Sequence, residues 1–131
     1  MPSFLNPLLK NGQHQHHLTN ERTGAIVAAE LLTAFDSASR RTGLLGRAML
    51  PDGTALIIAP CNAIHTIRMR FDIDVAFVAK DGRIVKLRHA VPPWRMSAAL
   101  GAFAVIEMAA GAFASRDVKV GDRLMVAGTD R

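Results

Sequence analysis

The sequence contains a single cysteine, Cys61, among its 131 residues. A disulfide needs two cysteines, so no bridge can form within the chain. This excludes the small secreted domains that depend on several bridges. The first twenty residues also lack the apolar run of an export signal. Because a lone thiol fits a reducing compartment, we expect a cytoplasmic protein.

Long hydrophobic runs and common catalytic motifs are absent as well. The longest apolar stretch, residues 24–35, is interrupted by Glu30 and falls short of the roughly 20 residues that a membrane-spanning helix needs. Neither a Gly-rich phosphate loop nor a Gly-x-Ser-x-Gly motif occurs, so the usual signatures of nucleotide hydrolysis and of serine hydrolases are lacking. Histidine and cysteine do not show the spacing of zinc sites. We therefore expect no metal, no cofactor and no membrane contact.

Half of the residues are apolar, which is enough to build a hydrophobic core and is unlike the composition of disordered segments. The length suits one compact domain. Residues 1–22 are predicted to form a polar N-terminal lead-in. Residues 23–131 are predicted to fold as a single β-rich domain.

The formal net charge of +5 lies downstream of residue 40. Residues 68–95 hold seven basic side chains against three acidic ones. The basic ones are Arg68, Arg70, Lys80, Arg83, Lys86, Arg88 and Arg95. They alternate with apolar residues, tyrosine is missing from the chain, and only Phe71, Phe77 and Trp94 nearby offer rings for stacking on bases. This pattern favours a solvated sheet face and leaves weak nucleic-acid binding as an alternative.

The apolar patterns predict a mainly β (α+β) fold with five to six or more strands and one or two short helices. Residues 55–59 form a continuous apolar run between turn residues, which is typical of a strand buried on both faces. Asp36 or Ser37 can cap a short helix that ends near Gly46. Residues 100–111 fit either a strand or a helix, and their alternation favours a strand.

Asp81-Gly82, between two alternating apolar segments, predicts a β-hairpin. In a two-residue turn both central positions need positive φ, which Asp and Gly tolerate. The paired residue numbers then sum to 163. Asp74 is therefore expected opposite His89, either as an edge pair that closes the sheet or as an acid–base pair.

Several segments of the sequence carry a resemblance to a known family. They are Arg40-x-x-Gly43-Leu44-Leu45-x-Arg47-x-x-Leu50, the run His65-Thr66-Ile67-Arg68-Met69-Arg70-Phe71-Asp72-Ile73-Asp74-Val75-Ala76-Phe77, and Val105-Ile106-Glu107-Met108-Ala109-Ala110-Gly111 with Gly121-Asp122. In order and spacing, residues 26–126 resemble the family known as domain of unknown function 192. The resemblance implies a small barrel-like β domain. It implies no activity, because none is established for the family.

The charged positions of the family pattern suggest a cluster. On an alternating strand Glu107 faces the core, where a carboxylate needs a partner. Arg40 and Arg47 would share one stripe of the short helix. The arginines are therefore expected either to form ion pairs with Glu107 or to bracket an anionic ligand. The sequence does not separate these two readings.

We expect a binding or accessory module for a small anionic ligand or a protein partner, rather than an enzyme. The candidate surface lies where the Arg40–Arg47 helix meets the strands that carry His65, Asp74 and Glu107. An enzyme that uses Asp74, His65 and Glu107 as acid and base groups is the first alternative. Cys61 as a nucleophile beside His65 is disfavoured, because four residues of extended chain span roughly 13 Å.

Overall fold

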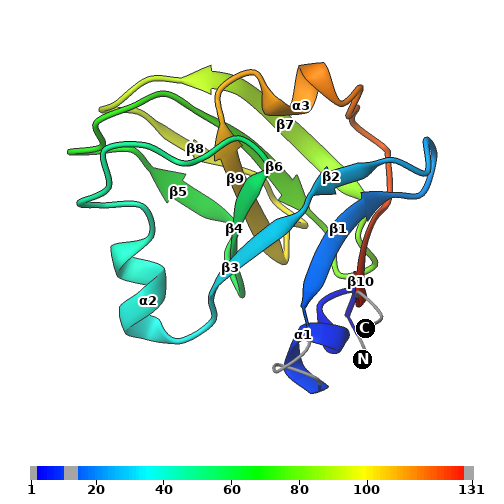
Figure 1. Ribbon diagram of the computed structural model, residues 1–131. Coiled ribbons are helices and arrows are strands. Elements are labelled where there is room, and N and C mark those ends of the chain that lie inside the picture. Colours follow the sequence, from blue (N-terminus) through cyan, green and yellow to red (C-terminus); the bar gives the residue numbers. More distant parts are fainter. Residues whose placement is uncertain (1–2, 11–14, 129–131) are drawn as a thin grey trace.

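The computed structural model describes residues 3–10 and 15–128. This part of the chain is mainly β, with ten strands in three sheets and three short helices (Figure 1). The prediction of a mainly β fold is confirmed, although the strands and helices are more numerous than expected. None of the helices among the described residues is long and apolar enough to cross a membrane.

A five-stranded sheet forms the centre of the fold. Its strands are, in spatial order, β3 (Glu30–Ala34), β4 (Thr54–Ile58), β9 (Ala104–Ala109), β6 (Ile73–Val78) and β7 (Ile84–Val91). β3 and β4 run parallel, and the other neighbours are antiparallel. Every residue of β4 and β6 is buried, as the apolar run over residues 55–59 predicted for β4. In the described part of the chain β3 and β7 remain edges, so the sheet does not close into a barrel.

Two smaller sheets complete the fold. One has the order β10 (Leu124–Gly128), β1 (His16–Asn20) and β2 (Ile26–Ala28); the other pairs β5 (Ala63–His65) with β8 (Met96–Ala98). The expected lead-in over residues 1–22 thus supplies β1 and a first helix, α1 (Asn6–Lys10). Leu5 and Leu18 from this segment are buried. The segment joins the domain because β1 pairs with a strand on each side, which gives its backbone groups partners.

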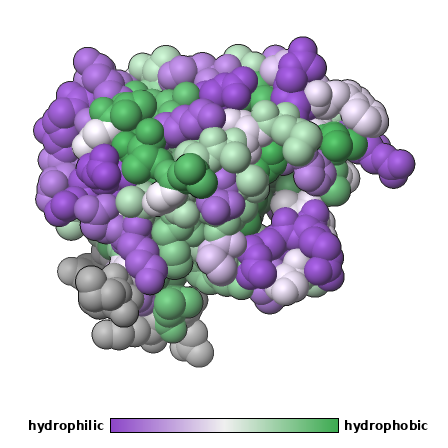
Figure 2. All heavy atoms as spheres, turned by 180° about the vertical axis from the view of Figure 1, so that it is seen from behind, coloured by the Kyte–Doolittle hydropathy of each residue, from purple (hydrophilic) through white to green (hydrophobic). Residues whose placement is uncertain are grey.

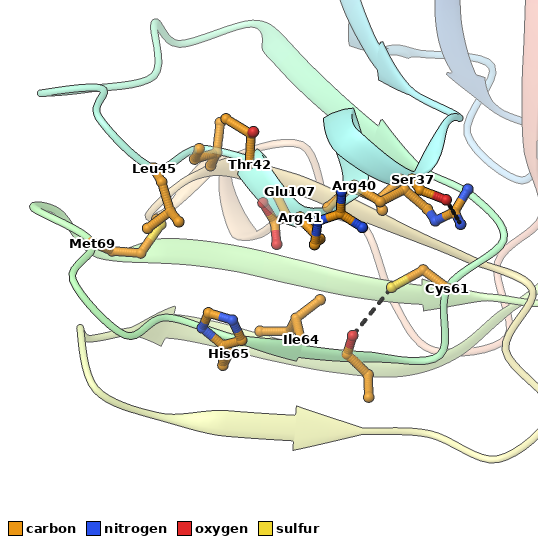
Figure 3. Close-up of a pocket in the computed structure, with 14 residues that line it drawn as sticks. Ser37, Arg40, Arg41, Thr42, Leu45, Cys61, Ile64, His65, Met69 and Glu107 are labelled. Carbon is orange, nitrogen blue, oxygen red and sulfur yellow. Dashed lines mark hydrogen bonds between the residues drawn. The ribbon is translucent and has the colours of Figure 1, made fainter.

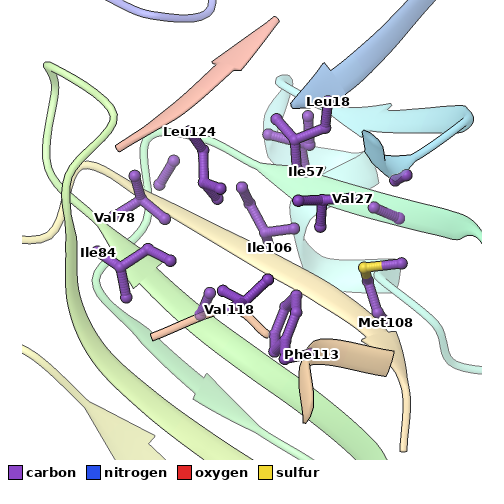
Figure 4. Close-up of a cluster of buried hydrophobic side chains, with 14 of the residues drawn as sticks. Leu18, Val27, Ile57, Val78, Ile84, Ile106, Met108, Phe113, Val118 and Leu124 are labelled. Atoms are coloured by element: carbon purple, nitrogen blue, oxygen red, sulfur yellow. The ribbon is translucent and has the colours of Figure 1, made fainter. Parts of the chain in front are cut away.

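Apolar clusters cover both faces of the central sheet. The first lies against the three-stranded sheet and the third helix, α3 (Ala112–Ser115), and includes Leu18, Ile106 and Phe113 (Figure 4). The second lies on the opposite face and includes Leu44 and Val105. Successive residues of β9 therefore point into different clusters, as alternation along a strand requires.

The hairpin of β6 and β7 keeps the expected register only in its middle. Ala76 pairs with Leu87, but Val78 pairs with Ile84 because the register shifts at each end. In the turn only Gly82 has a positive φ, of 93°, and the N–H of Ala79 bonds to the carbonyl of Arg83. The connection is thus a three-residue loop with a bulge, not a two-residue turn.

A second strand approaches the turn of the hairpin at Gly82. The N–H of Leu124 donates to the Gly82 carbonyl at 2.8 Å. A Cβ atom at Gly82 would collide with the carbonyl oxygen of Leu124. Only glycine fits this contact, which attaches the hairpin to the start of β10.

Asp122 joins the β1–β2 connection to the segment before β10. Its carboxylate accepts hydrogen bonds from Asn20 Nδ2 at 2.8 Å, from Arg22 Nε at 2.7 Å and from the Lys119 N–H at 2.9 Å. The hydrogen bond from Arg22 lowers the pKa of Asp122 to about 2. The family position Asp122 therefore has a structural explanation.

Asp74 connects three elements from inside the protein. Its carboxylate is fully buried and accepts hydrogen bonds from the backbone N–H groups of Ala90 at 2.9 Å and of Gly111 and Phe113 at 3.1 Å each. These donors belong to β7 and to the first turn of α3. Three N–H groups that would lack partners inside the protein are satisfied by one side chain.

We predict that Asp74→Asn lowers the free energy of unfolding by about 2 kcal/mol, because an amide NH₂ group then faces backbone donors. Urea unfolding followed by circular dichroism measures the effect. Asp72→Asn, at an exposed position two residues away, is the matched control and should change stability little. Equal stability of the two variants would show that the three hydrogen bonds of Asp74 are dispensable.

Candidate functional site

A cavity of about 470 Å³ lies between the second helix, α2 (Ser37–Thr42), and the sheets (Figure 3). The helix begins as predicted, because the Asp36 carboxylate accepts from the N–H of Ser39 at 2.8 Å. It ends at Thr42, earlier than predicted, because Gly43 adopts a φ of 48°. From behind, Figure 2 shows the hydrophilic surface of this region at the lower right, with a hollow between it and the rest of the molecule.

Ionisable side chains gather around the cavity. They are Arg40 and Arg41 from α2, Cys61 and His65 from the β4–β5 segment, and Glu107 from β9. Apolar side chains form much of the remaining wall, namely Leu44, Leu45, Ile58, Ile64 and Met69. Of the predicted site residues, the cavity unites Arg40, His65 and Glu107. Arg47 and Asp74 do not line it.

Glu107 is the most unusual group of the cavity. It lies opposite Leu56 of β4 and Val75 of β6, so its carboxyl enters the second apolar cluster, and only 5% of it is exposed. Neither of its oxygens has a hydrogen-bond or ion-pair partner in residues 3–10 and 15–128. Burial raises the pKa of Glu107 from 4.5 to about 7, and no neighbouring positive charge offsets this effect. At neutral pH the carboxyl is therefore partly protonated.

The expected ion pairs between Glu107 and the two arginines are not formed. Arg40 donates instead to the Phe35 carbonyl at 2.8 Å and to Ser37 Oγ at 3.5 Å. Arg47 lies beyond Gly43, in an exposed segment. Because the helix ends before Arg47, the two arginines do not share a helical stripe.

Arg41 is the cavity residue that sequence reasoning missed. It lies on the exposed side of α2, and Figure 3 shows its guanidinium in the space between α2 and β5. No hydrogen bond or ion pair joins it to another described side chain. The signal in the sequence was the pair Asp36 and Gly43, which marks a short helix on which Arg41 is the direct neighbour of the predicted Arg40.

Cys61 and His65 line the cavity without contacting each other. The Cys61 thiol donates to the Ala63 carbonyl at 3.1 Å, and burial raises its pKa. A raised pKa keeps the thiol protonated at neutral pH, whereas a nucleophilic cysteine needs the opposite shift. His65 is exposed, and its Nδ1 accepts the N–H of Ile67 at 3.3 Å. These contacts give no support to a Cys–His pair.

Asp74 lies on the other side of the sheet. It pairs with Met108, whose side chain belongs to the first apolar cluster, whereas Glu107 enters the second. Asp74, His65 and Glu107 therefore do not converge on one space. The predicted partner of Asp74, His89, is half-exposed, with its Nδ1 4.0 Å from Asp74 Oδ2. The register shift in the hairpin presents the Ala90 N–H to Asp74 at a closer distance.

Comparison with known proteins places the chain in a family. The model of DUF192, described as "Uncharacterized ACR", matches residues 18–126. The chain belongs to the DUF192 family. No curated protein matches it. DUF192 is an uncharacterised family, so membership assigns no activity to the chain.

Two solved structures share the fold. A protein of unknown function from Novosphingobium aromaticivorans DSM 12444 is 24% identical with a TM-score of 0.72, over 83% of this chain and 81% of the other. A protein from Sinorhizobium meliloti 1021, described as a "putative transcription regulator", is 19% identical with a TM-score of 0.73, over 88% of this chain and 95% of the other. At these identities the likeness concerns the fold alone.

Metal-ligating groups are sparse in the described ranges. No group of three or more His, Cys, Asp or Glu side chains there is arranged to hold a metal ion. Cys61, His65 and Glu107 line one cavity, but they do not form such a group. The chemistry of the cavity is therefore described by its carboxyl, its guanidiniums and its apolar wall.

We predict that Glu107→Gln removes a pH dependence of stability. An acid with a higher pKa in the folded chain stabilises the fold while protonated, so wild-type stability falls as the pH rises from about 4.5 to 7. The loss should approach about 3 kcal/mol, since one pKa unit corresponds to about 1.4 kcal/mol. Urea unfolding at pH 5 and pH 8 compares the proteins, which should be similarly stable at pH 5, with the variant more stable at pH 8. Parallel pH profiles would show that Glu107 has no raised pKa.

Proposed function

We propose that this DUF192 protein binds a small molecule in the cavity between α2 and β9. The observation that carries the proposal is the unpaired carboxyl of Glu107, which is buried and lines a cavity of about 470 Å³. Its carboxyl oxygens border the open space of the cavity and are not sealed inside the protein. A ligand in the cavity can therefore reach the carboxyl and hydrogen-bond to it.

The cavity wall also supports a small ligand. Pockets for small molecules are mostly apolar, with a few polar groups that fix orientation, and their volumes are about 300–1,000 Å³. Here leucine, isoleucine and methionine side chains surround one carboxyl, with arginines beside them on α2. The volume and the composition both fall within that description.

The geometry gives less support to catalysis. The three acid and base groups of an enzyme do not meet, because Asp74 is on the opposite face of the sheet and is occupied by backbone donors. The Cys61 thiol has a raised pKa. A binding role needs none of these groups to react, and we therefore favour it.

Binding can be tested by filling the cavity. Leu45, which lines it, is replaced by tryptophan, and Leu100, which is 96% exposed, receives the same substitution as the control. A library of small amphipathic fragments is screened by thermal shift, because a ligand of the folded state raises the melting temperature. We expect hits with the wild type and with Leu100→Trp, and their loss with Leu45→Trp.

Cys61 provides an independent measure of occupancy, since it is the only cysteine and lines the cavity. Alkylation by iodoacetamide, followed by intact-mass spectrometry, should slow when a fragment occupies the site. Fragments that stabilise the protein without protecting Cys61, or that still bind Leu45→Trp, would place binding elsewhere. Failure of every fragment to protect Cys61 would refute the proposal.

Weak nucleic-acid binding is a second candidate, favoured by the surroundings of Trp94. This tryptophan is 63% exposed and lies beside Arg95, and both are hydrogen-bonded through their backbones to Thr66, near Arg68. Lys80 lies at the turn of the hairpin, with its Nζ 5.4 Å from the centre of the Phe103 ring.

Trp94 is the only tryptophan of the chain, so its fluorescence reports this surface directly. If the second candidate is correct, a single-stranded oligonucleotide quenches the fluorescence at low salt and the effect disappears as salt rises. Arg95→Gln should weaken the quenching. Unchanged fluorescence at low salt would remove nucleic acid from consideration.

A further inference from the structure

We infer that the ligand of the α2 cavity is an amphipathic acid, with its anionic group at Arg41, an apolar body along the cavity wall and a hydroxyl group at Glu107. This rests on the proposed small-molecule function and specifies the ligand class. Arg41 and Glu107 line the same cavity. Each lacks a hydrogen-bond or ion-pair partner in the described part of the chain.

The charges around the cavity favour an anion. Two guanidiniums, those of Arg40 and Arg41, stand against the single carboxyl of Glu107. Arg40 is engaged with the Phe35 carbonyl and Ser37, whereas the guanidinium of Arg41 lies in the space beneath α2 (Figure 3). A guanidinium offers a fork of N–H donors that matches a carboxylate. Arg41 is thus the group that is available to an anionic ligand.

Arg41 and Glu107 do not form an ion pair, although they have opposite charge. No charge from α2 lowers the pKa of Glu107, whose shift arises from burial alone. The two groups are therefore separated, and a molecule that reaches both must carry two polar ends. Leu45, Ile64 and Met69 line the same space, so the part between these ends must be apolar.

The polar end at Glu107 is best matched by a hydroxyl group. A hydroxyl both donates and accepts, so it pairs with a carboxyl in either protonation state. A second carboxylate would be repelled once Glu107 ionises, and an ammonium would enter past two guanidiniums of the same charge. A hydroxyl avoids both penalties. The inferred ligand is therefore a hydroxy acid with an apolar spacer.

Three probes of similar size separate the contribution of the hydroxyl group to binding from that of the anionic group. They are 8-hydroxyoctanoate, which has both polar ends, octanoate, which lacks the hydroxyl, and 1,8-octanediol, which lacks the charge. 6-Hydroxyhexanoate and 10-hydroxydecanoate vary the spacer, since the fit depends on the separation of the ends. Affinities are measured by calorimetry, and iodoacetamide protection of Cys61 verifies that each probe occupies the cavity. We expect one hydroxy acid to bind about tenfold tighter than the alkanoate and the diol of the same length.

Arg41→Gln tests the anion position, with Arg47→Gln as the matched control outside the cavity. Arg41→Gln should weaken the binding of the hydroxy acid about tenfold and leave the affinity for the diol unchanged, because only the hydroxy acid loses a charge-assisted contact. Arg47→Gln should affect neither. Circular dichroism confirms that both variants are folded.

The outcomes separate this inference from the proposed function. If the diol binds as tightly as every hydroxy acid and protects Cys61, the cavity is a binding site but the ligand is not an acid, and the inference is overturned alone. The same holds if Arg41→Gln and Arg47→Gln have equal effects. If neither these probes nor any fragment of the library protects Cys61, the proposed function and the inference fail together.

Discussion

Strand β9 lies between β4 and β6 in the middle of the central sheet, with apolar clusters against both of its faces. Any polar side chain on this part of the sheet must enter an apolar environment, because alternation along the strand offers only those two directions. Asp74 on β6 and Glu107 on β9 are subject to the same constraint, and the fold treats them differently. Asp74 receives three backbone N–H groups, whereas Glu107 receives none and opens on a cavity.

This difference distinguishes the carboxylates that hold elements of the fold together from the one carboxyl that is open to a ligand. A buried carboxylate with three donors is explained by the elements that it joins. Gly111, one of these donors, adopts a φ of 92°, which favours glycine there. Asp122, with its donors from Asn20, Arg22 and Lys119, is explained in the same way. Glu107 has no such explanation in the protein itself. Glu107, the carboxyl without a structural role, is the one that lines the cavity.

The short length of α2 determines which charges reach that space. The capping carboxylate of Asp36 and the positive φ of Gly43 limit the helix to residues 37–42. Within this length Arg40 turns back to the Phe35 carbonyl, and Arg41 is left over the cavity. A longer helix would have carried Arg47 along the same stripe and produced a different arrangement of charge.

Local patterns in the sequence were sufficient for much of the fold. The buried run of β4, the start of α2 and the middle of the hairpin follow from burial, capping and alternation, which are properties of neighbouring residues. The predicted register was wrong at both ends of the hairpin. Contacts with distant residues are made there, by Leu124 at Gly82 and by Asp74 at the Ala90 N–H. No local pattern carries that information.

The candidate site was predicted in part for the same reason. Glu107 and Arg40 were brought together as expected, since a strand and a capped helix fix where their backbones lie. The direction of a guanidinium depends on the acceptors within its reach, and for Arg40 these are the Phe35 carbonyl and Ser37. Arg40 and Glu107 therefore line one cavity without forming an ion pair.

None of the residues Ser37–Thr42 in α2 is buried, and Figure 1 shows the helix standing apart from the central sheet at the lower left. A segment without buried apolar contacts opens at a small fraction of the free energy of global unfolding. α2 is thus the side of the cavity that opens at the lowest free energy, whereas β9, on the other side, belongs to the buried centre of the sheet. A local opening at α2 leaves the buried strands in place, because no residue of the helix belongs to either apolar cluster.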